Sequence, residues 1–144
     1  MKKIAVVDGQ GGGIGSVIIK KIKETYGERV EVWALGTNAI ATSQMLKAGA
    51  NKGATGPSAI CHCAPKVDII IGPISIIISN AMMGEVTPEI AIAVGSSPAH
   101  KLLLPLTQEP ISIIGVVKEP LPHLVDLLVN EHLKHFIEPS EGNS

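Results

Sequence analysis

Five glycines lie within seven residues near the start of the chain, in the segment Gly9-Gln10-Gly11-Gly12-Gly13-Ile14-Gly15. An apolar run, residues 3–7, predicts a buried strand before it, and helically spaced apolar residues predict a helix after it. Glycines at such a junction allow positive φ angles and let backbone N–H groups approach an anion. The helix N-terminus adds partial positive charge. We therefore predict that this turn binds a phosphate-bearing ligand, with a purely structural tight turn as the alternative.

The glycine spacing separates this turn from two common phosphate-binding motifs. Counted from Gly9, it fits G-x-x-x-G-x-G through Gly13 and Gly15, and it does not fit G-x-G-x-x-G. A Walker A loop needs a lysine directly after its last glycine, whereas the first lysine here is Lys20, well inside the predicted helix. Phosphoryl transfer of the P-loop kind is therefore disfavoured.

Polar residues at the ends of the first two predicted strands are further site candidates. Asp8 would repel a phosphate unless Mg²⁺ lies between them or its carboxylate binds a ligand hydroxyl; the alternative is a turn-forming bond to the backbone. Thr37 and Asn38 follow the second predicted strand. They are candidates for a ribose or base contact, and Asn38 is equally suited to cap the next helix.

The order of predicted elements indicates an α/β protein of the Rossmann-like, three-layer type. The predicted sheet is mostly parallel and five-stranded, in the order 2-1-3-4-5, with an antiparallel last strand because only residues 107–110 separate the last two strands. Residues 51–56 are expected to form a loop, residues 74–83 a buried helix, and residues 121–136 a closing helix. The predicted strands are residues 3–7, 29–35, 67–71, 101–106 and 111–117.

In this topology a ligand crevice is expected at the carboxyl ends of the first and third strands, where the direction of strand order reverses. The loops at that point are residues 8–16 and 72–75. The second loop contributes Gly72, Pro73 and Ser75 as candidate binding residues. The glycine pattern and the topology therefore indicate the same place.

Length and composition restrict the class of protein. The 144 residues are expected to form one domain, residues 1–138, followed by a flexible tail, residues 139–144. A net charge of −1 without a basic stripe disfavours nucleic acid as a partner. The longest charge-free stretch, residues 69–84, is too short to span a membrane, and no secretory signal is recognisable. We expect a cytoplasmic protein with no membrane partner.

Cys61, His62 and Cys63 combine three potential metal ligands in adjacent positions. Adjacent residues of a short helix point in different directions, and no second Cys/His cluster completes a tetrahedral site. We therefore predict no metal centre here and expect free thiols. The sequence does not assign a role to these three residues.

The glycine turn is similar to that of short-chain dehydrogenases, whose motif also ends in Gly-Ile-Gly, and the resemblance covers roughly the first 36 residues. Those enzymes use a Tyr-x-x-x-Lys pair, but Tyr26 is followed by Val30 at the lysine position. Neither an acidic residue for NAD nor an arginine for NADP follows the second predicted strand. The resemblance therefore implies NAD(P) or another nucleotide as ligand without implying that catalysis.

Three blocks together resemble a family of small bacterial Rossmann-like proteins of unknown function: VVDGQGGGIG, ALGTNAIATSQMLKAGA and DIIIGPISIIISNAMMGEVTP. The resemblance spans nearly the whole chain and implies a Rossmann-type fold with no established substrate. Our first hypothesis is a nucleotide-binding sensor or assembly component. The alternatives are a small redox or transferase enzyme whose site is completed across a homodimer, with Asp8, Ser75, Asn80 and Glu85 as polar candidates, and an interaction module without a ligand.

Overall fold

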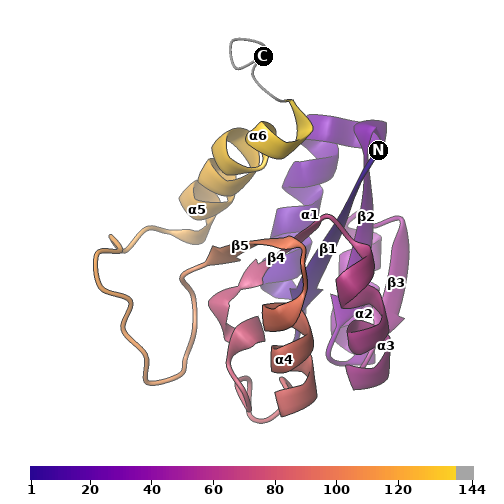
Figure 1. The fold of residues 1–144 in the computed structure, drawn as a ribbon. Coiled ribbons are helices and arrows are strands. Elements are labelled where there is room, and N and C mark those ends of the chain that lie inside the picture. Colours follow the sequence, from indigo (N-terminus) through magenta and orange to yellow (C-terminus); the bar gives the residue numbers. More distant parts are fainter. Residues whose placement is uncertain (139–144) are drawn as a thin grey trace.

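The computed structural model describes residues 1–138, so the predicted tail, residues 139–144, lies outside the described residues. Five parallel strands form one sheet in the order β3-β2-β1-β4-β5 (Figure 1). The strands are β1 (Lys2–Asp8), β2 (Val30–Gly36), β3 (Lys52–Thr55), β4 (Ile69–Pro73) and β5 (His100–Leu104).

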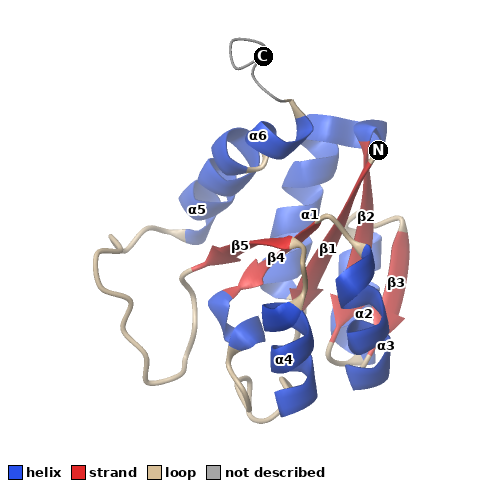
Figure 2. Cartoon of the chain, viewed as in Figure 1, coloured by secondary structure: helices blue, strands red, loops and turns tan. Residues whose placement is uncertain are grey.

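Helices cover both faces of this sheet, which gives the three-layer α/β arrangement (Figure 2). One apolar cluster joins the sheet to α1 (Gly13–Tyr26), α2 (Ala39–Lys47) and α5 (Leu121–Leu127). The other joins it to α3 (Pro57–Cys63) and α4 (Pro88–Ser96). The remaining helical segments are η1 (Gly27–Arg29), η2 (Ala64–Lys66), η3 (Ile74–Ile77), the π-helical η4 (Leu128–His132) and α6 (Lys134–Ile137).

The central strands are apolar on both faces because a helical layer covers each of them. In β1, Ile4 and Val6 belong to one cluster, and Ala5 and Val7 belong to the other. All four side chains are completely buried. Continuous apolar runs of this kind are typical of parallel strands buried on both sides. The sequence-based α/β class is therefore confirmed.

The predicted strand order 2-1-3-4-5 and the antiparallel last strand are wrong. Residues 52–55, which were expected to be a loop, form the edge strand β3 beside β2. This strand has no apolar alternation, because it lies at the edge and most of its side chains face solvent. The last strand, β5, follows the crossover through α4 and runs parallel to β4.

The segment expected to supply an antiparallel strand, residues 111–117, is exposed loop. Hydrogen bonds just before it turn the chain away from the edge of β5. The Ser75 hydroxyl donates to Thr107 Oγ1 at 2.8 Å, and the Met82 N–H donates to Glu109 Oε1 at 3.2 Å. Residues 107–109 are thereby held beside η3 and the loop after it, so they do not form a hairpin on β5.

Two predicted helices also differ in the structure. The predicted buried helix 74–83 consists of the 3₁₀ turn η3 followed by turns, with left-handed backbone at Asn80, Met82 and Met83. The closing helix changes from α to π geometry at η4 before α6. The buried Tyr26 hydroxyl donates to the Val129 carbonyl at 2.7 Å and so connects α1 to η4. Among residues 1–138, no helix combines the length and apolarity needed to cross a membrane.

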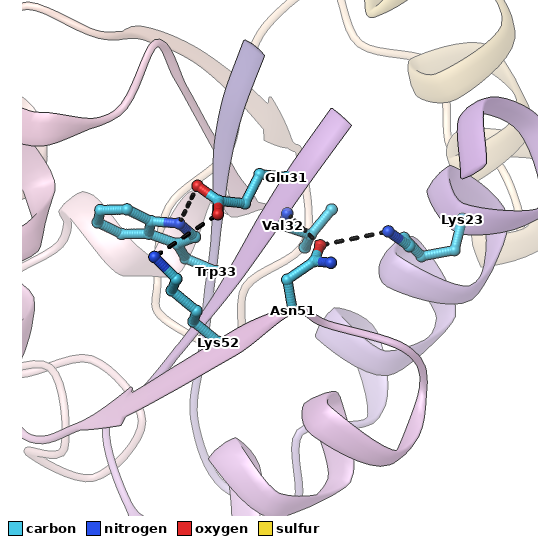
Figure 3. A network of polar contacts seen from close by, with 6 residues as sticks. All are labelled: Lys23, Glu31, Val32, Trp33, Asn51 and Lys52. Atoms are coloured by element: carbon cyan, nitrogen blue, oxygen red, sulfur yellow. Dashed lines mark hydrogen bonds and ion pairs between the residues drawn. The ribbon is translucent and has the colours of Figure 1, made fainter. Parts of the chain in front are cut away.

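Polar side chains secure the junction of β2 and β3 (Figure 3). Asn51 Oδ1 accepts hydrogen bonds from the Val32 N–H at 2.8 Å and from Lys23 Nζ at 3.2 Å. The Trp33 indole N–H donates to Glu31 at 3.0 Å, and Glu31 also pairs with Lys52. These contacts compensate for the small apolar area that the short strand β3 contributes.

Candidate functional site

A cavity of about 710 Å³ opens at the carboxyl ends of β1 and β4. Its volume lies within the range of about 300–1,000 Å³ that is usual for small-molecule sites. The position is the point at which the strand order reverses, where open parallel sheets bind ligands. The lining residues are Asp8, Gly9, Gln10, Gly11, Gly13, Ile14, Pro73, Ser75, Asn80, Met82, Met83, Leu106, Thr107, Gln108, Glu109 and Leu121.

Three of the five glycines in the turn are needed for packing. Gly12 has a φ of +73°, and a Cβ there would lie 2.8 Å from the Ala41 carbonyl oxygen. A Cβ on Gly15 would lie 2.5 Å from the Met45 sulfur, where α1 approaches α2. A Cβ on Gly9 would lie 2.6 Å from the Met82 sulfur. These glycines allow close approach of neighbouring segments.

The other two glycines, Gly11 and Gly13, have open space where a side chain would be and line the cavity. Gly13 is the first residue of α1, so its N–H has no acceptor within the helix. The first turn of α1 contains no acidic side chain. A helix N-terminus carries partial positive charge and is suited to an anion, and here the Asp8 carboxylate already accepts from the Gly15 N–H of this first turn.

Asp8 points its carboxylate into the turn and stabilises it. Oδ1 accepts from the Gly9 N–H at 2.8 Å, and Oδ2 accepts from the Gly15 N–H at 2.7 Å. The side chain is buried, and this desolvation, together with the nearby Glu85 charge, raises the pKa of Asp8 above the usual aspartate value, although the backbone N–H groups of Gly15, Gly9 and Ile14 act in the opposite direction. Asp8 therefore fixes the shape of the turn around the start of α1.

Glu85, in the loop between η3 and α4, connects the glycine turn to the end of β2. Its Oε1 accepts three hydrogen bonds: from the Gln10 N–H at 2.8 Å, the Thr37 hydroxyl at 2.7 Å and Asn38 Nδ2 at 2.8 Å. Partial burial raises its pKa, but these three donors outweigh it, so the pKa of Glu85 lies below the usual glutamate value. Glu85 therefore closes the crevice on the β2 side.

The opposite wall of the cavity comes from the segment after β5. Ser75, at the start of η3, is buried and bonds Thr107. The Thr107 hydroxyl oxygen also accepts from the Glu109 N–H at 3.1 Å. Since Glu109 in turn accepts from the Met82 N–H, the two loops hold each other in place. The wall is thus fixed by side chains rather than by sheet pairing.

Left-handed backbone is concentrated around this cavity. Among the described residues, four that are not glycine have a positive φ: Gln10, Asn80, Met82 and Met83. All four line the cavity. Such conformations cost of order 1–3 kcal/mol each and cluster at ligand-binding sites in proteins.

The structure brings together eight of the predicted site residues in the cavity wall: Asp8, Gly9, Gln10, Gly11, Gly13, Ile14, Pro73 and Ser75. The other five predicted site residues do not line it: Gly12, Gly15, Thr37, Asn38 and Gly72. Asn38 Oδ1 accepts from the Ala41 N–H at 2.8 Å and so caps α2, while Gly72 packs against the Val7 carbonyl.

Sequence reasoning missed the wall formed by Met82, Met83 and residues 106–109, together with Leu121. These residues carry no recognisable motif, and their contacts with the turn join positions far apart in the chain. The approach of the Met82 sulfur to Gly9 is one example. Only the polar residues within DIIIGPISIIISNAMMGEVTP, residues 68–88, could have indicated this wall from the sequence.

The Cys-His-Cys segment lies away from this cavity. The Cys61 sulfur lies 3.6 Å from the Glu89 carbonyl oxygen, and His62 contacts Lys66 at 2.8 Å. His62 and Cys63 both line a separate cavity of about 270 Å³ beside Trp33. Within residues 1–138, no group of three or more His, Cys, Asp or Glu side chains is arranged to hold a metal ion.

The fold and the cavity define a doubly wound, parallel α/β protein with a ligand-sized site at its switch point. The chain belongs to the family described as "Domain of unknown function (DUF3842)", which matches residues 3–137. This result agrees with the sequence-based resemblance to a family without an established substrate. Comparison with curated proteins gave no match.

Two solved structures are similar to the chain at low identity. One is a dodecameric FMN-dependent Ubix-like decarboxylase from Escherichia coli O157:H7, with 14% identity, a TM-score of 0.45 and 94% of each chain covered. The other is a universal stress protein in complex with cAMP, with 16% identity and a TM-score of 0.42. That match covers 72% of this chain and 98% of the other. Likeness at this level says nothing about the ligand of the present chain.

Proposed function

We propose that the chain binds a nucleotide, or a similar small ligand with one phosphate group, in the cavity at the ends of β1 and β4. The observation that carries this proposal is the open backbone of Gly11 and Gly13 at the N-terminus of α1. The phosphate would accept hydrogen bonds from these N–H groups, as anions do at helix N-termini. Gly9, Gly12 and Gly15 would hold the turn in shape without touching the ligand's phosphate.

The charge of the cavity favours a single phosphate. Of the described residues that line it, none is Lys, Arg or His, and two carry carboxylates, Asp8 and Glu109. A triphosphate would place several negative charges near these carboxylates without a cationic side chain to balance them. Mg²⁺ would be needed for such a ligand, whereas one phosphate group is within the capacity of a helix N-terminus.

At the end of β2 the crevice is closed by Glu85 and its hydrogen-bond donors, and this arrangement favours a mononucleotide over NAD(P). In typical dinucleotide-binding domains, the residue that binds the adenosine ribose follows the second strand. Here Thr37 and Asn38 occupy that position, and both already donate to Glu85. The nucleoside part would therefore extend toward β4 and β5, where Met82, Leu106 and Leu121 offer apolar surface.

The backbone strain around the cavity supports a ligand-binding role over a ligand-free interaction module. Four residues in left-handed conformations would cost several kcal/mol in total, since each costs of order 1–3 kcal/mol. A fold that only presents an outer surface has no need for this strain at an internal cavity. We infer that the protein acts in the cytoplasm as a sensor or an assembly component.

The test is thermal unfolding of the full chain with AMP, GMP, FMN, NAD, NADP and ATP, each with and without Mg²⁺. Adenosine and guanosine serve as controls without phosphate. A ligand at about 100 times its Kd adds roughly 2.7 kcal/mol, which raises the Tm by several degrees. We expect monophosphates to raise the Tm without Mg²⁺ and nucleosides to have no effect. A panel without any shift would refute nucleotide binding.

The same samples separate binding from catalysis. After incubation with the protein, chromatography should recover the stabilising nucleotide unchanged if the protein is a sensor. Conversion of the nucleotide would instead show an enzyme and would overturn the sensor interpretation. Asp8 and Glu109 would then be the first residues to substitute, since they are the ionisable groups of the cavity wall.

A further inference from the structure

A second, smaller cavity lies between β2, β3 and the end of α3. Its volume is about 270 Å³, just below the range of about 300–1,000 Å³ that is usual for small-molecule sites. The lining residues are Trp33, Leu35, Lys52, Gly53, Ala54, His62, Cys63 and Lys66. None of them lines the cavity at the ends of β1 and β4, so the two cavities are separate.

The pairing of β2 with β3 explains why space is left at this place. Trp33 lies beside Lys52 in the parallel register, and two positions further on Leu35 lies beside Ala54. Because side chains alternate between the two faces of a strand, all four share one face. The helix on this face, α3, has only seven residues, and Ala54 is small. The Trp33 indole is therefore only partly covered.

The walls of this cavity are apolar, whereas its ionisable side chains are basic. Trp33, Leu35 and Cys63 belong to the apolar cluster of this face or pack against it. Lys52 and Lys66 are exposed and supply ammonium groups. Of the described residues that line the cavity, none is Asp or Glu, which is the reverse of the larger cavity with its two carboxylates. The smaller cavity is thus suited to an anion with an apolar body.

The charge around the cavity fits a single carboxylate. Lys52 already pairs with Glu31 at 3.6 Å, and Glu31 also accepts from the indole N–H (Figure 3). Lys66 Nζ lies 2.8 Å from His62 Nε2, and no carboxylate within residues 1–138 forms an ion pair with it. One positive charge is therefore uncompensated. A phosphate monoester carries about −1.5 to −2, so a singly charged acid matches this site better.

We propose that this cavity is a second ligand site and that it binds a small organic acid. The carboxylate pairs with Lys66, and the apolar body lies against the Trp33 indole and the Cys63 side chain. Both parts of the ligand are needed, because an exposed ion pair alone contributes little and the cavity alone is small. This site is distinct from the proposed nucleotide site and does not depend on it.

The first experiment uses the fluorescence of Trp33, which is the only tryptophan of the chain. The full chain is titrated with hexanoate and phenylacetate, with their amides as uncharged controls, and with acetate and inorganic phosphate. We expect saturable changes with the two acids and at least tenfold weaker binding of the amides, because the charged partner of Lys66 is lost. No saturation by either acid would overturn the proposal. Saturation by phosphate with inert acids would also overturn it and would show a phosphate site.

Two lysine variants test whether Lys66 holds the ligand or only offsets the negative end of its helix. Lys66→Met keeps the apolar stem and should weaken hexanoate binding at least tenfold. Lys47→Met, at an exposed lysine in the last turn of α2, is the matched control and should bind hexanoate as wild type does. Equal binding by both variants would mean that Lys66 serves only its helix, and this result would refute the assignment.

The second experiment locates the acid through the thiol in the cavity wall. In a Cys61→Ser protein, Cys63 is the only cysteine, and mass spectrometry follows its alkylation by iodoacetamide. We expect hexanoate to slow this alkylation at the concentrations that saturate the fluorescence change. Unchanged alkylation at saturating hexanoate would place the acid outside the cavity and refute the proposal. Neither experiment contains nucleotide, so failure of the proposed function would leave both results readable.

Discussion

Two adjacent glycines of the turn should respond in opposite ways to alanine. Gly13 is the first residue of α1, its φ is not positive, and a Cβ there meets no atom within 4 Å. Gly13→Ala should therefore fold normally and gain about 0.4–1 kcal/mol from the reduced entropy of the unfolded chain. Gly12 has a φ of +73°, and a Cβ there would lie 2.8 Å from the Ala41 oxygen and 2.9 Å from its Cα. Both opposing atoms are backbone and cannot rotate away.

The magnitudes follow from these contacts. For Gly12→Ala, a left-handed alanine costs about 1–2 kcal/mol, and overpacking adds about 1–3 kcal/mol. We expect a net loss of roughly 2–4 kcal/mol, which lowers the Tm by about 10 °C for a chain of this size. Gly13→Ala should raise the Tm by up to about 4 °C. Its methyl group would nevertheless displace the phosphate from the N–H groups, and losing one charge-assisted bond weakens binding roughly 10- to 100-fold.

Urea unfolding and nucleotide titration of the two variants provide the assay. The informative result is a Gly13→Ala protein that is at least as stable as wild type and binds at least tenfold more weakly. Equal binding by Gly13→Ala would show that the phosphate does not lie at the start of α1. A loss of stability above about 1 kcal/mol in Gly13→Ala would show that the space around Gly13 is filled, and the reasoning from the open glycines would fail.

Three further predictions concern polar side chains. Glu85→Gln should lower the free energy of unfolding by about 1–2 kcal/mol at pH 7, because the charged acceptor of three hydrogen bonds is lost. Since the folded pKa of Glu85 is depressed, its stabilising effect is present above the usual value of 4.5 and is lost as the pH falls through the lowered pKa. Urea unfolding at pH 7 and pH 3 should therefore show a smaller difference between the two proteins at pH 3. In a ¹³C NMR titration, Asp8 should titrate above 3.8, and its protonation favours the folded state as the pH falls; an unshifted Asp8 would contradict its burial. Tyr26→Phe should cost about 1–2 kcal/mol, because the buried Val129 carbonyl loses its 2.7 Å bond, and unchanged stability in urea would rule out that role.

The parts of the fold that could be predicted are those with strong local patterns. The apolar run of β1 and the three isoleucines of β4 indicated buried strands, because a strand covered on both faces needs no polar alternation. Thr87 and Pro88 indicated the start of α4, and the Thr87 hydroxyl does accept from the Ile90 N–H at 3.2 Å. Helix capping joins residues only a few positions apart, so the start of this helix can be predicted from the local sequence alone.

The errors occurred where long-range contacts override local preference. The Lys-Gly-Ala-Thr sequence of β3 has weak strand character, and its pairing with β2 is a backbone interaction. Residues 111–117 have strong strand character but no partner strand within the described chain.

In the candidate site, too, the locally encoded part could be predicted and the part that depends on long-range contacts could not. The glycine turn was recognisable because its residue types are local, and the topology indicated the switch point. The roles of individual glycines depend on Ala41, Met45 and Met82, which approach the turn from other segments. Glu85 was proposed only as a polar candidate, and its three bonds to the turn and to the end of β2 required the structure.

The most direct test of the central claim is a titration of ¹⁵N-labelled protein with AMP, followed by amide NMR. Our account predicts that the amide signals of Gly11 and Gly13 shift most, because their N–H groups would bind the phosphate at the start of α1. Adenosine should leave these two signals nearly unchanged. The largest shifts at another place, such as the cavity beside Trp33, or no shift at saturating AMP, would contradict the account.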